Sequence, residues 1–134
     1  MTTLSSAAPE KRLLLDTHVF LWWQEASDRL APHVADRIAN ASEVHVSVAT
    51  AWELAIKVAA GKLRLGESFA DAVEENRFGL LPITLDHVAV VASMPLHHRD
   101  PFDRMLIAQA RHEQLTLVTH DREFGAYPVS IVFT

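Results

Sequence analysis

The stretch "KRLLLDTHVFLWWQEA", residues 11–26, combines a strand pattern and a helix pattern without a loop between them. Its first part is a short apolar run that ends at Asp16, which is typical of a strand buried on both faces of a sheet. Residues 17–26 are predicted to form a helix that begins immediately after this strand. A buried strand that runs directly into a helix is the building unit of α/β proteins.

The same alternation continues along the rest of the chain. Strands are predicted at 11–16, 43–48, 80–83, 115–120 and 129–133, and helices at 17–26, 31–42, 49–62, 67–79, 86–94 and 100–114. Gly61 and Gly79 are expected to end the helices that contain them. This pattern predicts an α/β fold, with a central parallel sheet covered by helices on both faces. Ligands of such sheets bind beyond the carboxyl ends of the strands.

Composition limits the class of protein. The chain has 134 residues, 49% of them hydrophobic, which predicts a single domain over 1–134 with a loose N-terminal segment at 1–11. It has no cysteine, so a disulfide framework and a thiolate metal site are excluded, and a cytoplasmic location is expected. The longest apolar run, 13–23, is interrupted by polar residues and is too short to span a membrane. The net charge of −5 argues against a broadly basic surface that coats nucleic acid, although a local basic rim remains compatible with it.

Four acidic residues lie at the junctions where strands are predicted to pass into helices: Asp16, Glu53, Asp103 and Asp121. Several carboxylates at one edge of a sheet repel one another unless a cation neutralises them, and carboxylate oxygens suit Mg²⁺ or Mn²⁺. Such an ion can activate water for attack on a phosphodiester. The sequence therefore predicts a divalent metal site that could serve phosphodiester hydrolysis.

Each acid also has an ordinary structural interpretation. Asp16 and Asp121 are acceptable N-caps, and Asp100 followed by a proline is a better one. Asp103 could be the third residue of a capping box. Glu53 lies too far into its helix to cap it, but it could form an exposed ion pair with Lys57. The metal site is favoured because caps need no partner from another element.

The quoted opening stretch and three further motifs together resemble the PIN domain, specifically the VapC-type toxins of bacterial toxin–antitoxin pairs. The motifs are "LLLDTHVFLWW" (13–23), "VSVATAWELAIK" (46–57), "HRDPFDRMLIAQA" (98–110) and "LTLVTHDREF" (115–124), and the resemblance spans about residues 12–133. It implies an α/β/α sandwich and a metal-dependent endoribonuclease, with Mg²⁺ or Mn²⁺ held by Asp16, Glu53, Asp103 and Asp121. Thr17 and Thr119 match hydroxyl positions of the family motif. The motif aligns best on Asp103, which leaves Asp100 as the N-cap with a supporting role.

The resemblance also implies an RNA substrate, a homodimer and a VapB-like antitoxin that covers the site. Three arginines flank the acids and could contact RNA phosphates, or could be ordinary surface charges: Arg99, Arg104 and Arg122. His97 and His98 lack any cysteine or HExxH context for a zinc site, so a loop or phosphate-contact role is expected of them. Trp22 and Trp23 lie about 100° apart on one helix, so one is expected in the core and the other in an interface.

Two further functions remain open at the level of sequence. A receiver-like domain phosphorylated on Asp16 should have a paired acid before its strand and a late lysine, and neither is found. A non-catalytic RNA- or protein-binding module with the same fold should have lost some of the four acids, yet all four are present. The metal-dependent ribonuclease is therefore the favoured function.

Overall fold

A single parallel sheet forms the centre of the computed structural model, which describes residue 8 and residues 11–134. Its strands are β1 (Arg12–Leu15), β2 (Glu43–Ser47), β3 (Gly79–Leu81), β4 (Thr116–Thr119) and β5 (Ile131–Phe133). They pair in the order β3-β2-β1-β4-β5, with every neighbouring pair parallel. The predicted parallel sheet is confirmed. Receiver-like domains have the order 2-1-3-4-5, so the observed order does not support that alternative.

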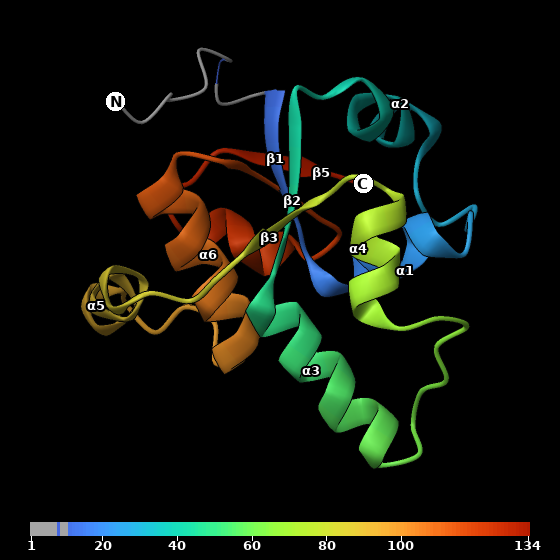
Figure 1. Ribbon diagram of the computed structural model, residues 1–134. Helices are drawn as coiled ribbons and strands as arrows, with labels where there is room; N and C mark the ends of the chain where they lie inside the picture. Colours follow the sequence, from blue (N-terminus) through green and yellow to red (C-terminus); the bar gives the residue numbers. More distant parts are fainter. Residues whose placement is uncertain (1–7, 9–10) are drawn as a thin grey trace, which may run out of the picture.

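Helices cover both faces of the sheet (Figure 1). α1 (Thr17–Gln24), α2 (Pro32–Asn40) and α4 (Phe69–Glu75) lie on one face, and α5 (Leu85–Ser93) and α6 (Pro101–Glu113) lie on the other. Alternate residues of β1 enter separate cores: Leu13 and Leu15 pack on the α1 side, and Leu14 packs on the α6 side. This division follows from the two-residue period of a strand. The predicted three-layer α/β/α sandwich is confirmed.

α3 (Val48–Ala59) begins at the end of β2 and projects from the sheet (Figure 1). Its first turn is held by a buried polar contact to α6. The Ser47 hydroxyl accepts a hydrogen bond from the Ala49 backbone N–H (2.9 Å) and donates one to Gln109 Oε1 (2.6 Å). Gln109 is fully buried and also donates to the Pro82 carbonyl (3.2 Å). One amide on α6 therefore connects that helix to the β2–α3 junction and to the segment after β3.

The predicted end of the 67–79 helix at Gly79 is wrong. α4 ends at Glu75, and Arg77, which has a φ of 57°, turns the chain away from the helix. Gly79 is instead the first residue of β3. A Cβ atom at this position would lie 2.7 Å from Nδ1 of His45 on the neighbouring strand β2, so any other residue would force the imidazole to move. By contrast, Gly61 lies just beyond the end of α3 with a φ of 71°, as predicted.

The tandem tryptophans of α1 both pack within the chain. Trp22 is 9% exposed, which agrees with the prediction that one of the pair is a core residue. Trp23, however, is partly buried against Phe78 and donates from its indole N–H to Asn76 Oδ1 (3.0 Å). The segment after α4 covers the ring that was expected to project into an interface. The exposed tryptophan is Trp52 on α3, at 60%.

The N-terminal segment predicted to be loose, 1–11, lies outside the described residues apart from Ala8 and Lys11. The Lys11 carbonyl accepts a hydrogen bond from the Ser42 backbone N–H (2.9 Å), so this residue is attached to the sheet. In the part of the chain that the structure describes, no helix combines the length and the apolarity needed to cross a membrane.

Candidate active site

The direction in which strands are added to the sheet reverses at β1 and β4. The chain leaves β1 towards β2 and β3 on one side, and the later strands β4 and β5 lie on the other side. The boundary between the two halves is the position where parallel sheets bind ligands. Asp16 directly follows β1 and Thr119 is the last residue of β4, so both residues lie at this boundary.

Asp16 is both a helix cap and a buried member of the site. Its side chain is largely shielded, with the residue 4% exposed, and Oδ1 accepts from the Val19 backbone N–H (2.8 Å). Oδ2 accepts a short hydrogen bond from the Thr119 hydroxyl. Burial raises the pKa of Asp16, and the hydrogen bonds from Thr119 and Val19 oppose this shift only in part. The capping interpretation of Asp16 is therefore correct, and it does not compete with a role at the sheet edge.

Glu53 forms the predicted ion pair and also reaches the end of β1. Its Oε2 lies 3.1 Å from Lys57 Nζ, which is the predicted i, i+4 ion pair. Its Oε1 accepts from the Thr17 hydroxyl (2.7 Å), and that hydroxyl lies 3.2 Å from the Thr50 hydroxyl. Thr17 begins α1, so this bond draws Glu53 across to the end of β1. The side chain is 13% exposed, so the ion pair is not on a fully solvated face of the helix.

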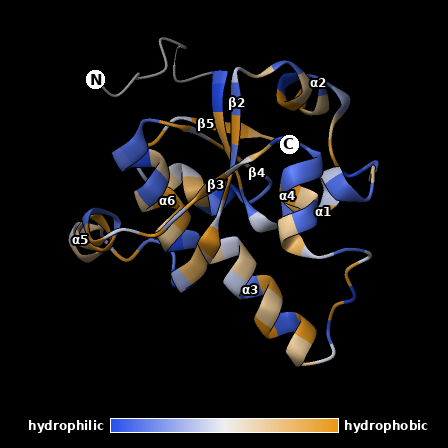
Figure 2. Ribbon diagram, in the orientation of Figure 1, coloured by the Kyte–Doolittle hydropathy of each residue, from blue (hydrophilic) through white to orange (hydrophobic). Residues whose placement is uncertain are grey.

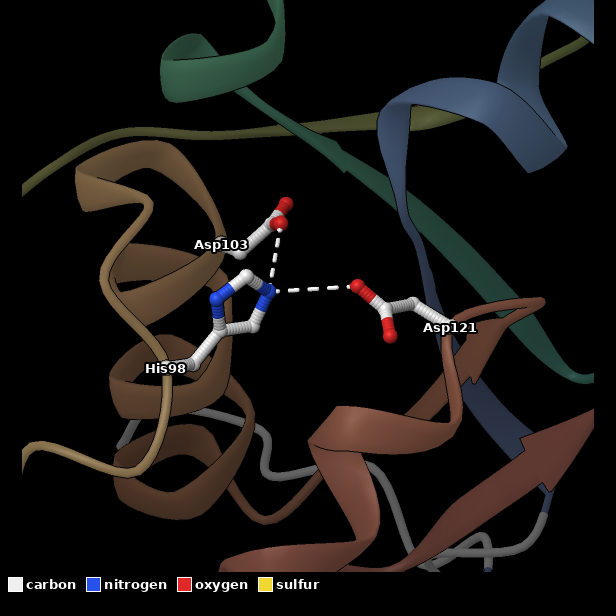
Figure 3. Close-up of side chains that lie close together, drawn as sticks. All are labelled: His98, Asp103 and Asp121. Carbon is white, nitrogen blue, oxygen red and sulfur yellow. Dashed lines mark hydrogen bonds and ion pairs between the residues drawn. The ribbon is translucent and has the colours of Figure 1, made fainter.

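Asp103 and Asp121 come together at the imidazole of His98 (Figure 3). His98 Nε2 lies 2.9 Å from Asp103 Oδ2 and 3.1 Å from Asp121 Oδ2. One ligand atom from each of these three residues lies within 4.8 Å of the other two, which makes them a possible metal-binding group among the described residues. Asp121 also accepts the Glu123 backbone N–H (2.9 Å) as the N-cap of the 3₁₀ helix η2 (Arg122–Ala126).

Electrostatic coupling connects all four acids. The pKa of Asp103 is raised to about 7, first because the carboxyl is desolvated and second because Asp100 repels its charge. Asp16 and Glu53 raise it further, whereas His98 lowers it. Asp121 in turn raises the pKa of Asp16. The acids from four separate elements thus share one region of negative potential, which a divalent cation would neutralise.

Asp100 and Asp103 have different roles at the start of α6. Asp100 Oδ1 accepts from the backbone N–H groups of Phe102 (2.9 Å) and Asp103 (3.0 Å), so Asp100 is the N-cap. The capping box considered for Asp103 is not formed, because the Asp100 backbone N–H donates to His98 Nδ1 instead (3.4 Å). The Asp103 carboxylate is therefore directed to the site and not to its own helix.

The three arginines that flank the acids differ in whether their guanidinium groups could contact a phosphate. Arg104 donates to the backbone carbonyls of Val91, Met94, Pro95 and His98 and to the Tyr127 hydroxyl, at 3.0–3.3 Å. Its guanidinium supports the loop before α6, so we do not propose a phosphate contact for it. Arg122 lies over the ring of Phe133 (4.4 Å to the centroid), and Arg99 is exposed.

The closeness of two further residues to the acids was not predicted from the sequence. His98 was expected to be a loop residue, and the adjoining aspartates in the motif "HRDPFD" were the only signal that it could reach the site. Trp52 precedes Glu53 and its ring contacts Phe102, which precedes Asp103, with the centroids 5.0 Å apart. The exposed Trp52 and the partly buried Phe102 thus form an aromatic pair beside two of the acids.

The raised pKa of Asp103 predicts a pH dependence of stability. In the folded protein this carboxyl keeps its proton up to about pH 7, whereas the unfolded chain loses it near pH 3.8. Its contribution to the free energy of unfolding is therefore greatest below pH 3.8 and is lost as the pH rises through 7. We expect the melting temperature of the metal-free protein to fall between pH 5 and pH 8, and Asp103→Asn to reduce that fall. Thermal melts in EDTA check this, and equal slopes for the two proteins would contradict it.

Comparisons with known proteins give the chain its family. The sequence model of the PIN domain matches residues 13–129. Ribonuclease VapC22 of Mycobacterium tuberculosis is 31% identical over 123 residues, which cover 86% of this chain and 91% of that protein. The motifs quoted above fall within the matched region.

Two solved toxin–antitoxin structures have a similar fold. A chain of VapBC2 from Rickettsia felis, bound to a DNA fragment from its promoter, superposes with a TM-score of 0.68 at 15% identity, covering 91% of this chain and 98% of that chain. A chain of DNA-bound VapBC from Salmonella typhimurium superposes with a TM-score of 0.67 at 21% identity, covering 91% of this chain and 97% of that chain. At these identities the structures support the fold alone. Together with the family match over most of its length, the architecture leads to one conclusion: this chain belongs to the PIN domain family.

Proposed function

We propose that this PIN domain is a metal-dependent endoribonuclease that acts as the toxin of a toxin–antitoxin pair. The observation that carries the proposal is the convergence of acids at one sheet edge, where Asp103 and Asp121 lie 2.9 Å and 3.1 Å from the same imidazole nitrogen. Burial, and then the charges of Asp100, Asp16 and Glu53, raise the pKa of Asp103 there. Helix caps need no partner from another element, so capping roles alone would not bring these carboxylates together. A nuclease is supported by the family, and RNA as the substrate is supported by the relative named as a ribonuclease.

The four carboxylates would hold Mg²⁺ or Mn²⁺, because oxygen donors suit both ions. A bound divalent cation supplies a water of lowered pKa and stabilises the leaving oxygen of the phosphodiester. The chain's own residues fix the carboxylates in place. Thr17 orients Glu53, and Thr119 joins Asp16 to Asp121 by donating to Asp16 and accepting from the Asp121 backbone N–H (3.0 Å).

RNA would lie across the exposed side chains around this edge. Arg99 and Arg122 remain candidates for phosphate contacts, since guanidinium groups bind phosphate through paired hydrogen bonds. These contacts would offset the repulsion between the acidic chain and the RNA backbone.

The test of this function is RNA cleavage with added metal. We expect the purified protein to cut total RNA with Mg²⁺ or Mn²⁺ and to lose that activity in EDTA. Glu53→Gln is expected to lower cleavage by about 100-fold or more, because it removes a charged oxygen donor from the cation. Glu74→Gln, an exposed change on α4, is the matched control and should cleave normally. Metal binding without cleavage of any RNA would favour a non-catalytic module.

We further propose a VapB-like antitoxin as the partner. The support is that the similar structures are complexes of toxin and antitoxin. A pocket of about 460 Å³ between α1 and the segment before α4, lined by Phe20, Leu21 and Phe69 among others, could receive part of such a partner. Expression of the wild-type chain in bacteria should stop growth, and co-expression of its antitoxin should restore it. Growth unaffected by the wild-type chain would contradict the toxin role.

A homodimer is the second proposed assembly, and α3 is the surface that supports it. α3 projects from the sheet and has hydrophobic residues along its length (Figure 2). Trp52 is 60% exposed and Ile56 48%, and because they lie one turn apart on the same face of α3, a second copy of the chain could cover both. We expect Ile56→Glu to give a monomer in sedimentation velocity, and Leu80→Glu, at an equally exposed position on β3, to remain dimeric. A wild-type monomer would contradict this assembly.

A further inference from the structure

The side chain of His98 occupies an unusual position for a loop residue. It is 11% exposed and lies among the carboxylates of the site, and its ring meets the edge of Phe124 with the centroids 5.6 Å apart. The Tyr127 hydroxyl accepts the backbone N–H groups of His97 (3.0 Å) and His98 (2.8 Å) and donates to the Pro95 carbonyl (2.9 Å). Arg104 holds the His98 carbonyl (3.3 Å). The loop therefore presents the imidazole in a fixed direction.

One nitrogen of this imidazole faces two carboxylate oxygens. His98 Nε2 lies 2.9 Å from Asp103 and 3.1 Å from Asp121, which belong to different elements. A single N–H points in only one direction and cannot make two well-aligned hydrogen bonds. Adjacent ligands of an octahedral cation with bonds of about 2.1 Å lie about 3.0 Å apart. The imidazole nitrogen is thus spaced from each carboxylate oxygen as a neighbouring ligand of one ion would be, and the two oxygens lie within 4.8 Å of each other.

The other ring nitrogen has two neighbours that compete for it. In the structure Nδ1 accepts a long hydrogen bond from the Asp100 backbone N–H (3.4 Å), and this bond would have to break when Nε2 binds a cation. Coordination through Nε2 places the remaining proton on Nδ1, where it requires an acceptor. His98 Nδ1 lies 3.5 Å from Glu123 Oε2. Metal-ligating histidines commonly donate their second N–H to a carboxylate, which fixes the orientation of the ring. Glu123 could accept the Nδ1–H hydrogen bond after a small movement, because its side chain is 66% exposed.

We propose that His98 binds the divalent cation of this site through Nε2, alongside Asp103 and Asp121, and that Glu123 holds its Nδ1–H. This inference rests on the proposed metal-dependent function and adds a nitrogen ligand to a set of carboxylates. Nitrogen ligation favours transition metals over Mg²⁺. Mg²⁺ prefers oxygen donors and gives up its bound water reluctantly. The site should therefore bind Mn²⁺ more tightly than Mg²⁺, and His98 should account for part of that difference.

Pulsed electron paramagnetic resonance of the Mn²⁺-loaded protein tests the ligand directly. We expect the wild type to show the ¹⁴N modulation of a coordinated imidazole. His98→Gln should lose it, and His97→Gln, the same change at the neighbouring residue, should retain it. By calorimetry, His98→Gln should weaken Mn²⁺ binding by about 10- to 100-fold and Mg²⁺ binding by less. Glu123→Gln, at an exposed position where folding is not at risk, should retain the modulation and weaken Mn²⁺ binding to a smaller extent.

The outcomes separate this inference from the function on which it rests. Tight Mn²⁺ binding to the wild type without imidazole modulation would overturn the role of His98 and leave an all-carboxylate site. Modulation that persists in His98→Gln would overturn it as well. Absence of Mn²⁺ binding to the wild type would overturn the metal-dependent function itself. Melting curves of the variants identify any loss of binding that results from unfolding.

Discussion

Asp103→Asn is expected to lower metal-dependent RNA cleavage by about 1,000-fold, which is the effect expected when a charged group is removed from the centre of an active site. Burial and the charges of Asp100, Asp16 and Glu53 raise the pKa of Asp103, so a cation here would neutralise a carboxylate that its surroundings disfavour. The substitution preserves shape and removes no cap, because the backbone of α6 is capped by Asp100. Initial rates on a defined RNA, with Mg²⁺ and with Mn²⁺, measure the loss.

Asp100→Asn is the matched control for this prediction. Asparagine caps helices as well as aspartate does, so the hydrogen bonds to Phe102 and Asp103 should remain and the melting temperature should change little. Cleavage should stay within a few-fold of the wild type. If Asp100→Asn abolished cleavage and Asp103→Asn did not, the assignment of the two acids would have to be exchanged.

Arg104→Met should produce the largest loss of stability among the site variants. The guanidinium donates to four backbone carbonyls and to Tyr127, and methionine leaves those acceptors without their charged donor. The expected cost is about 3 kcal/mol, which corresponds to a fall of about 10 °C in the melting temperature of a chain of this length. Urea denaturation and thermal melts measure it.

The same variant should also weaken metal binding, since the loop that Arg104 holds presents His98 to the site. Arg99→Met, an exposed change in the same loop, is the control and should leave the free energy of unfolding within about 0.5 kcal/mol of the wild type. An Arg104→Met protein as stable as Arg99→Met would show that the loop keeps its conformation without the guanidinium.

The sequence was sufficient for the sheet and for the location of the four acids. Buried strands and helices alternate clearly, and the carboxyl ends of parallel strands necessarily meet at one edge, so Asp16 and Asp121 could be placed there from their positions alone. The capping role of Asp100 was predictable for the same local reason, because Asp followed by Pro is a strong helix start. The assignment of the four acids as metal ligands stays a prediction.

Features that depend on distant residues could not be predicted in this way. The fate of Trp23 depends on Phe78 and Asn76, more than fifty residues later, which cover its ring. Gly79 resembled a helix end, but it begins β3, where its backbone lies against the side chain of His45 on the neighbouring strand. The direction of His98 is set by Tyr127 and Arg104, and no local pattern around the histidine encodes those contacts.

The buried amide of Gln109 has a consequence for how the site meets a cation. Ser47, which Gln109 binds, begins the helix that carries Glu53, and Gln109 itself lies on the helix that carries Asp103. The two helices are therefore joined beneath the site and should move as one rigid body. Folding therefore already holds their carboxylates close together against their mutual repulsion. Binding of a cation should then cost little conformational entropy.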